Sequence, residues 1–395
     1  METLLEKIEN EPRMHARLSD FIKIKHGFAF KGEYFSVRPT KDVLVTPGNF
    51  AIGGGFKADK YKYYAGAVPE DYILKTGDLV VTMTDLSVDA DTLGYSALIP
   101  NDSGVQFLHN QRVGLVQQIK EGVDLGFLNY LMRTREYQSY IVGGASGSTV
   151  KHTSPDRIAS FEYDFPSVPM QRKIAEILSA YDEKIENNKK IIQNLETAAQ
   201  TIFDEWFVAF RFPRYEKVKM IEGGVEEIPE GWEEENVLDV IERIGVGKKY
   251  DNKSALPTGK VQILDQGKSG NIGYHNDEPG VMASIENPVV VFTNHTCYYR
   301  LMTEPFSCIQ NVLPYIGKNG YPTLFIYFLT KEKIKMQEYK GHWPDFEEQK
   351  FIVPPAKLAN DFVEKITPLI VKMVACEKES AILKESRDRL LAKLI

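Results

Sequence analysis

The stretch PSVPMQRKIAEILSAYDEKIENNKKIIQNLETAAQTIFDEWF, residues 166–207, decides the fold. Apolar side chains recur at alternating steps of three and four, which is the heptad spacing of one helix packed along another. The seam consists of Leu178, Tyr181, Ile185, Asn188, Ile192, Leu195, Ala199, Ile202 and Trp206, with one polar break at Asn188. The pattern predicts a helix of about 40 residues, which is about 60 Å long at ~1.5 Å per residue.

The stretch PPAKLANDFVEKITPLIVKMVACEKESAILKESRDRLLAKLI, residues 354–395, repeats this pattern. A shift of 188 positions takes Pro166 to Pro354, and it carries the first seam onto Ile366, Leu369, Met373, Cys376, Ser380, Leu383, Arg387, Leu390 and Leu394. Most of these positions are apolar, so the two helices are expected to bury their seams on each other as an antiparallel coiled coil. Pro368 lies inside the second pattern and predicts a kink or a break there.

The segments that precede the two helices also correspond. GDLVVTMT (77–84) resembles NPVVVFTN (287–294), and NQRVGLV (110–116) resembles IQNVLPY (309–315), all with strand patterns. FLNYLMRTREY (127–137) resembles LFIYFLTKEKI (324–334), and each is predicted to be an amphipathic helix. An internal duplication follows from these matches.

The predicted fold is therefore mixed α/β (α+β), with two similar globular domains, two long antiparallel helices and a pseudo-two-fold repeat. Its parts are an N-terminal segment 1–17, a globular domain 18–165, a central helical region 166–212, a linker with the second globular domain 213–353, and a distal helical region 354–395. DNA presents equivalent faces at multiples of roughly 34 Å, so a duplicated domain on a rigid spacer suggests an interrupted, two-part DNA site. An ordinary dimerising coiled coil is the alternative that the helix pattern leaves open.

Composition limits the classes of protein that this chain can represent. Its net charge of −7 counts against a simple polyanion binder, but residues 213–236 hold eight Glu against three Lys or Arg and so carry −5 of that charge. Cys297, Cys308 and Cys376 lack the paired spacings of a disulfide framework or a zinc site. No apolar run approaches the ~18 residues of a membrane helix, and the acidic N-terminus is no signal peptide. A cytoplasmic protein without a membrane partner is expected.

The first helix resembles the central conserved region of the specificity (S) subunits of type I restriction–modification systems. The matching residues are Pro169, Gln171, Lys173, Ile174, Ala175, Ile177, Leu178, Asp182, Ile185, Leu195 and Gln200, while Met170 replaces the usual acidic residue. LKESRDRLLAKLI (383–395) is similar to the distal conserved region of that family. GASGSTVKHTSPDRI (144–158) and GKSGNIGYHNDEP (267–279) look like loops of its target-recognition domains.

The resemblance implies a non-catalytic DNA-binding subunit. Each globular domain would recognise one half of an asymmetric, interrupted DNA sequence, and the helices would hold the spacing and bind two modification (M) subunits. S-adenosylmethionine and the adenine methyltransferase chemistry would belong to the M subunits. ATP and Mg would belong to a restriction (R) subunit where the system has one, so no cofactor is expected in this chain.

Catalytic motifs are missing from the sequence. An adenine methyltransferase needs Asn/Asp-Pro-Pro-Tyr/Phe, which neither VPPA (353–356) nor ENPVV (286–290) fits. Gly267, Lys268 and Ser269 resemble the end of a phosphate-binding loop, but Gln262 stands where the first glycine is required. PDFEEQK (344–350) contains Asp345 and Glu348-x-Lys350, the residue types of a metal-dependent nuclease motif. Only two residues separate Asp345 from Glu348, which is too few for the turn that such a site needs between its two strands. No metal site is expected.

Candidate DNA contacts are basic or polar residues in loops rich in glycine and aromatic residues. In the first domain these are Lys57, Lys60, Lys62, Tyr63, Ser148, Thr149, Lys151 and His152. In the second they are Lys248, Lys249, Lys253, Lys268, Ser269, Asn271 and His342. The exposed faces of 170–206 and 357–394 are the expected docking surfaces for partner subunits. A coiled-coil scaffold with two protein-binding modules, or an enzyme with an unrecognised site, remain alternatives, and the bases recognised cannot be deduced.

Overall fold

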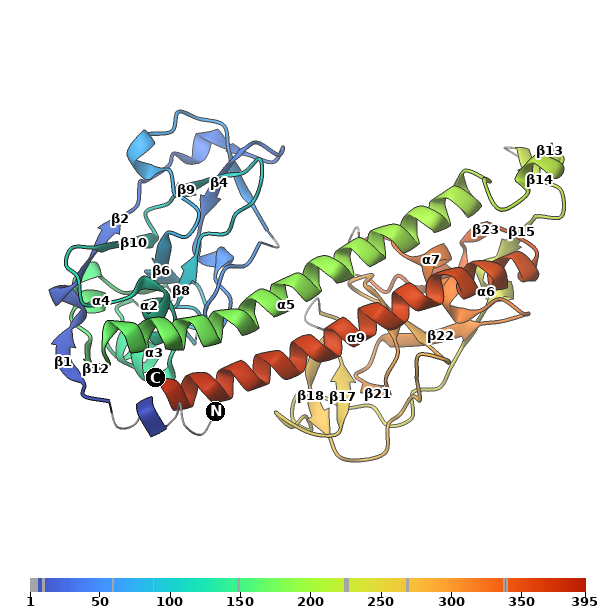
Figure 1. The fold of residues 1–395 in the computed structure, drawn as a ribbon. Coiled ribbons are helices and arrows are strands. Elements are labelled where there is room, and N and C mark those ends of the chain that lie inside the picture. Colours follow the sequence, from blue (N-terminus) through green and yellow to red (C-terminus); the bar gives the residue numbers. More distant parts are fainter. Residues whose placement is uncertain are drawn as a thin grey trace. The chain divides into compact units, whose positions relative to one another are not determined.

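The computed structural model describes residues 6–8, 11–58, 60–87, 89–147, 150–223, 227–267, 270–336, 338 and 340–395. The chain divides into two compact units (Figure 1). The first comprises Met1–Glu186 with Ala381–Ile395, and the second comprises Asn187–Ser380. Each unit is a mixed α/β body that contains one part of α5 (Val168–Phe203) and one part of α9 (Ala356–Leu394).

The first unit contains two four-stranded sheets. One has the antiparallel order β2-β10-β6-β8, with strands at Ile22–His26, Val113–Gln118, Leu79–Thr82 and Ser96–Leu98. The other has the order β3-β5-β4-β9, with strands at Phe35–Ser36, Lys62–Tyr64, Asp42–Val45 and Gln106–His109, and its β4 and β9 are parallel. Two antiparallel ribbons pair β1 (Met14–Arg17) with β12 (Glu162–Phe165), and β7 (Thr84–Asp85) with β11 (Lys151–His152).

Short polar residues start the helices α2, α3 and α4 of the first unit. Asp124 accepts the Phe127 N–H at 3.0 Å at the start of α2 (Leu125–Leu131). Thr134 does the same for α3 (Arg135–Gly143), and Ser154 for α4 (Pro155–Ala159). Each side chain satisfies a backbone donor that the first helical turn leaves unpaired. Because Thr134 starts a new helix, residues 127–137 form parts of two helices, and the prediction of one continuous helix there was wrong.

The second unit repeats the topology of the first. Its four-stranded antiparallel sheet has the order β16-β22-β19-β20, with strands at Ile241–Arg243, Val312–Gly317, Val289–Thr293 and Tyr299–Met302. Its second sheet, β18-β17-β21 (Asn271–His275, Val261–Leu264 and Phe306–Cys308), again contains one parallel pair, β17 with β21. The strand matches predicted at 77–84 with 287–294, and at 110–116 with 309–315, fall on β6 with β19 and on β10 with β22.

The remaining elements of the second unit follow the same plan. Strand β15 (Glu233–Asn236) pairs with β23 (Lys350–Val353), as β1 pairs with β12 in the first unit. The helices are α6 (Val237–Val240), α7 (Thr323–Thr330) and α8 (Trp343–Glu347). An additional hairpin, β13 (Met220–Glu222) with β14 (Glu227–Pro229), precedes β15.

The core of the second unit is rich in aromatic side chains. Phe203, Trp206 and Phe207, at the end of α5 and in the π-helical turn Asp204–Val208 that follows it, are buried with Phe325 and Phe362. The rings of Phe207 and Phe362 meet edge to face, with centroids 5.1 Å apart. Trp206, the last residue of the predicted seam, and Phe207 therefore both lie in the core.

In each unit, the segments of α5 and α9 pack side by side and run antiparallel (Figure 1). In the second unit, Asn188 donates to Ser380 Oγ at 3.2 Å, while Ala199 shares a core cluster with Ile366. In the first unit, Leu178 shares a core cluster with Leu394, at the opposite end of the numbering. The predicted seam residues are buried or half-buried in both units: Leu178, Tyr181, Ile185, Ile192, Leu195, Ile202, Ile366, Leu369, Met373, Leu383, Leu390 and Leu394.

Helix α9 continues through Pro368, so no break occurs at that position. Proline removes one backbone donor from the helix ladder, which leaves one carbonyl without its usual partner. Pro368 is exposed, and so is Glu364, whose carbonyl would have accepted that bond. Water can therefore reach this carbonyl, and the helix tolerates the proline.

Candidate nucleic-acid interface

A buried asparagine shapes the first predicted DNA-binding loop. Asn49 is 1% exposed, and its Nδ2 donates to the carbonyls of Lys57 and Lys60 at 3.2 and 3.1 Å. The N–H of Lys57 returns to the carbonyl of Asn49 at 2.8 Å. The backbone groups of Lys57 and Lys60 are thus held in place while both lysine side chains stay exposed and able to contact an anion.

Lys62 and Tyr63 lie on β5 with their side chains on opposite faces. The Lys62 side chain is exposed, and its Nζ is 3.9 Å from the centroid of the Phe35 ring. Its pKa is lowered, first by partial burial and then by the positive charge of Arg112. Tyr63 is half-buried and packs against the cluster that contains Val43 and Phe107, so it offers less surface to a ligand.

The predicted residues on β11 lie on a strand of two residues. Lys151 is half-buried, while His152 is exposed and its Nδ1 is 3.1 Å from Thr84 Oγ1. The backbone of His152 also pairs with Ser146 in both directions, at 2.9 and 3.0 Å. Ser148 and Thr149 fall outside the described residues.

In the second unit, the predicted lysines precede β17. Lys249 and Lys253 are exposed. Lys248 is exposed too, but its Nζ is 2.8 Å from Asp277 and lies 4.8 Å from the centroid of the Tyr250 ring. The ion pair raises the pKa of Lys248, and a DNA phosphate would have to compete with Asp277 for this ammonium group.

Lys268 and Ser269 fall outside the described residues, but Arg300 anchors the residues on both sides of them. Arg300 donates to the carbonyl of Asp265 and to the carbonyl of Gly270, both at 3.1 Å, and also to the carbonyl of Gly267. Asn271 is half-buried, and its side chain accepts the N–H of Gly273. Its Oδ1 is therefore engaged within the loop.

His342 was wrongly predicted as a surface contact. It is 1% exposed and stands just before α8. Its Nε2 lies 3.1 Å from the carbonyl of Glu338, and its Nδ1 lies 2.9 Å from Oδ2 of Asp345. Both ring nitrogens thus have internal partners, and the ring ties the segment before α8 to the first turn of that helix.

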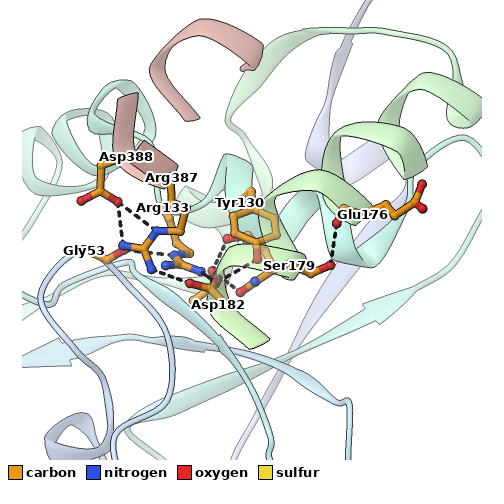
Figure 2. Close-up of polar contacts among 10 residues, drawn as sticks. Gly53, Tyr130, Arg133, Glu176, Ser179, Asp182, Arg387 and Asp388 are labelled. Carbon is orange, nitrogen blue, oxygen red and sulfur yellow. Dashed lines mark hydrogen bonds and ion pairs between the residues drawn. The ribbon is translucent and has the colours of Figure 1, made fainter. Parts of the chain in front are cut away.

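A charged network in the first unit joins α5 and α9 to the end of α2 (Figure 2). Oδ2 of Asp182 accepts from Nη1 of Arg133 and from the hydroxyl of Tyr130, both at 2.8 Å. Oδ1 of Asp182 accepts from Arg387. Arg133 also donates through Nε to the carbonyl of Gly53 at 3.1 Å, so the network reaches the segment that leads into the Lys57 loop.

The network keeps Asp182 ionised. Burial opposes the charge, but the guanidinium groups of Arg133 and Arg387 more than offset burial, and the pKa of Asp182 falls below its ordinary value. Neither Arg133 nor Tyr130 was singled out from the sequence. In the stretch FLNYLMRTREY, Arg133 looks like an ordinary exposed residue of a helix. Its acceptor Asp182 lies 49 positions away in the sequence, so no local pattern indicates the pair.

Gln171, a residue of the family motif, links α5 to the body of the first unit. It is fully buried, and its Oε1 accepts the N–H of Asp124 at 2.8 Å. Its Nε2 donates to the carbonyls of Pro166 and Gly122 at 2.9 and 3.2 Å. These contacts fix the start of α5 against the start of α2.

Metal-ligand and membrane-spanning features are both missing from the described part of the chain. Among those residues, no group of three or more His, Cys, Asp or Glu is placed to hold a metal ion. No helix within the described ranges is both long and apolar enough to span a bilayer.

Comparison with known proteins shows which proteins this chain is similar to. Residues 10–197 match the family model described as "Type I restriction modification DNA specificity domain". The chain is 26% identical over 306 residues to the type I restriction enzyme MjaIX specificity subunit of Methanocaldococcus jannaschii, covering 70% of this chain and 69% of that protein. It is 39% identical over 77 residues to the type I restriction enzyme HindI specificity subunit of Haemophilus influenzae, covering 20% of this chain and 17% of that protein.

The fold has a solved counterpart. The crystal structure of a type I restriction–modification S subunit from M. genitalium matches with a TM-score of 0.59 at 16% identity, over 98% of this chain and 96% of that one. Residues 10–197 thus match the specificity domain of type I restriction–modification systems, and the resemblance stated from the central helix motif is confirmed. The solved S subunit supports the fold.

Proposed function

We propose that this chain is the non-catalytic DNA-sequence specificity subunit of a type I restriction–modification complex. Each globular domain recognises one half of an interrupted DNA site, and α5 and α9 set the distance between the halves. The helices also bind two M subunits, which supply S-adenosylmethionine and methylate adenine. An ATP-dependent restriction subunit joins where the system encodes one.

The observation that carries the proposal is the duplication of one α/β topology in both units. The strand orders β2-β10-β6-β8 and β16-β22-β19-β20 place corresponding strands at corresponding positions. In each unit an antiparallel α5–α9 segment packs into the core. A duplicated domain on shared long helices is an economical way to recognise two DNA segments at a fixed spacing.

The loops differ between the units, which favours two different half-sites. The first unit presents Lys57 and Lys60 on a loop held by Asn49. The second presents Lys248 and Lys253 near Tyr250, with Lys248 paired to Asp277. Base recognition depends on which donors and acceptors reach each groove, so different loops select different sequences.

Exposed apolar residues on α9 support partner docking on that helix. Val371 and Ile382 of α9 are 42% and 64% exposed. Large apolar side chains on the polar face of a helix are typical of positions that a partner covers. We assign these faces of 170–206 and 357–394 to the M subunits.

Methylome sequencing tests the proposal. Cells that express this chain with its M subunit should gain one interrupted methylated motif, and cells with the M subunit alone should lack it. Exchange of residues 18–165 for another target-recognition domain should then alter one half of the motif. A change in both halves, or no motif with the intact chain, would contradict the assignment.

A further inference from the structure

A basic and aromatic surface in the first unit shares Lys62 with the predicted DNA contacts and otherwise consists of residues that were not among them. Residues 22–67 hold eight Lys or Arg against three Asp or Glu, in a chain whose net charge is −7. Local charge decides where a polyanion binds, because screening limits its reach to about 10 Å at ~0.1 M salt. The surface is formed by Lys25, Phe28, Tyr34, Phe35, Lys62 and Arg112, and is called here the aromatic–basic face.

The aromatic rings of this face are partly exposed and pack against buried aromatic residues. Phe28, Tyr34 and Phe35 are 36%, 44% and 39% exposed. Phe28 meets the buried Phe30 edge to face at 5.1 Å, and Phe30 meets Tyr64 at 5.0 Å. Such exposure of large apolar rings, together with a fixed geometry, marks a binding surface.

Two of the three cations of the face, Lys25 and Lys62, lie over aromatic rings. Lys25 lies 4.6 Å from the centroid of Tyr72 and donates to the carbonyl of Asp71 at 2.6 Å. Lys62 stands over Phe35. Within the described ranges, neither Lys62 nor Arg112 forms an ion pair with a carboxylate. The positive charge of Arg112 instead contributes to the lowered pKa of Lys62, so the two repel each other and an anion between them would relieve the repulsion.

The turn that carries Arg112 is attached to the aromatic part of the face. The N–H of Phe28 donates to the carbonyl of His109 at 2.8 Å, and the N–H of Gln111 donates to the carbonyl of Phe28 at 3.0 Å. A Cβ at Gly27 would lie 2.1 Å from the carbonyl oxygen of Asn110, so glycine permits this close approach. Lys62 pairs with Leu44 in the sheet, and Leu44 pairs with Leu108 just before the same turn.

We propose that the aromatic–basic face binds the sugar–phosphate backbone of duplex DNA beside the first half-site, with Lys62 and Arg112 each contacting a phosphate. This inference rests on the proposed function, since it names the surface by which the first domain is held on DNA. Phosphate contacts fix register and orientation and carry no base information. The glycine-rich loops of the same unit are then left to contact the bases.

The test uses the complete complex of this chain with its M subunits and duplexes that carry the methylated motif. The variants are Lys62→Gln, Arg112→Gln and the double variant. Lys120→Gln is the matched control, because Lys120 is also exposed but lies beyond the far end of β10, which is about 20 Å from Arg112 at ~3.3 Å per residue. Melting temperatures confirm that each exposed substitution leaves the fold intact.

Each single face variant should weaken binding about eightfold at ~0.1 M salt, and should reduce the slope of log K against log salt by about 0.9, the contribution of one phosphate. The double variant should weaken binding by roughly 60-fold and reduce the slope by about 1.8. The loss should be equal for duplexes altered in either half-site. Wild-type slopes in both face variants, or the same loss in Lys120→Gln, would overturn the inference while leaving the proposed function in place. If the wild-type complex showed no sequence-specific binding, the proposed function itself would fail.

Discussion

Replacement of Asp182 with Ala should destabilise the first unit by about 3–5 kcal/mol, the usual cost of removing one partner from a buried ion pair. The structure places this change near the lower end of that range, because the Asp182 side chain is itself 31% exposed and Arg387 keeps Asp388 as a partner. The side chains of Arg133 and Arg387 are only 3% and 12% exposed, and both use Asp182 as an acceptor. Without the carboxylate, two guanidinium groups remain charged and poorly hydrated, and the Tyr130 hydroxyl loses its acceptor as well.

Denaturant unfolding of the full chain, followed by circular dichroism, measures the loss. Asp388→Ala is the matched control, because Asp388 also contacts Arg387 but its side chain is 52% exposed. An exposed ion pair contributes about 0–1 kcal/mol. Hydrogen exchange should locate the effect, with faster exchange in α2 than in its counterpart α7. A loss below about 1 kcal/mol, or one equal to that of Asp388→Ala, would refute the reasoning.

Three further predictions concern pH, helix anchoring and the second domain. Folding lowers the pKa of Asp182, so the contribution of this carboxylate to stability is complete above its unfolded pKa near 4 and is lost as the pH falls through its folded pKa. Between about pH 5 and pH 2, the denaturant midpoint should therefore fall less in Asp182→Asn than in the wild type. Gln171→Ala should cost about 2 kcal/mol by calorimetry, since it leaves buried backbone groups unpaired. Lys268→Ala with Asn271→Ala should weaken binding to duplexes with the correct second half-site, and unchanged affinity would remove that loop from the interface.

Periodic features of the structure could be predicted from the sequence. The heptad seams identify both long helices, because a helix that buries one stripe must repeat apolar residues every three to four positions. The β-branched runs at 77–84 and 287–294 identify β6 and β19 for the same kind of reason. Local spacing encodes such elements, so they are visible without knowledge of the fold.

Contacts between distant segments could not be predicted in this way. The partners Arg133 and Asp182 are 49 positions apart, and Asp182 and Arg387 are 205 apart. The sequence around His342 is typical of a surface loop. Its burial depends on the contact with Asp345 and on the path of the chain before α8, which the sequence does not show. The aromatic–basic face likewise combines residues from β2, β3 and β5, from the segment between β2 and β3, and from the turn before β10, and none of these segments is distinctive alone.

The second unit lacks the charged network, although the rest of the topology is repeated. By the matches between the two halves, Arg133 corresponds to Thr330, Asp182 to Ile370 and Arg387 to Ala199. Thr330 bonds to the hydroxyl of Tyr315 at 2.7 Å. Ala199 and Ile370, together with the Tyr130 counterpart Tyr327, line a cavity of about 200 Å³. Small and apolar side chains therefore occupy the positions that an ion network fills in the first unit.

This difference predicts that replacing all three charged residues of the network lowers the free energy of unfolding less than replacing Asp182 alone. The triple variant Arg133→Thr, Asp182→Ile, Arg387→Ala reproduces the second unit's solution and leaves no buried charge without a partner, and apolar replacement of buried ion pairs is often neutral or stabilising. It should be more stable than Asp182→Ala by at least about 2 kcal/mol, despite carrying two more substitutions. If the free-energy losses of the three changes simply added, the arginines would contribute independently of Asp182, and the cost of Asp182→Ala could not come from stranded charge.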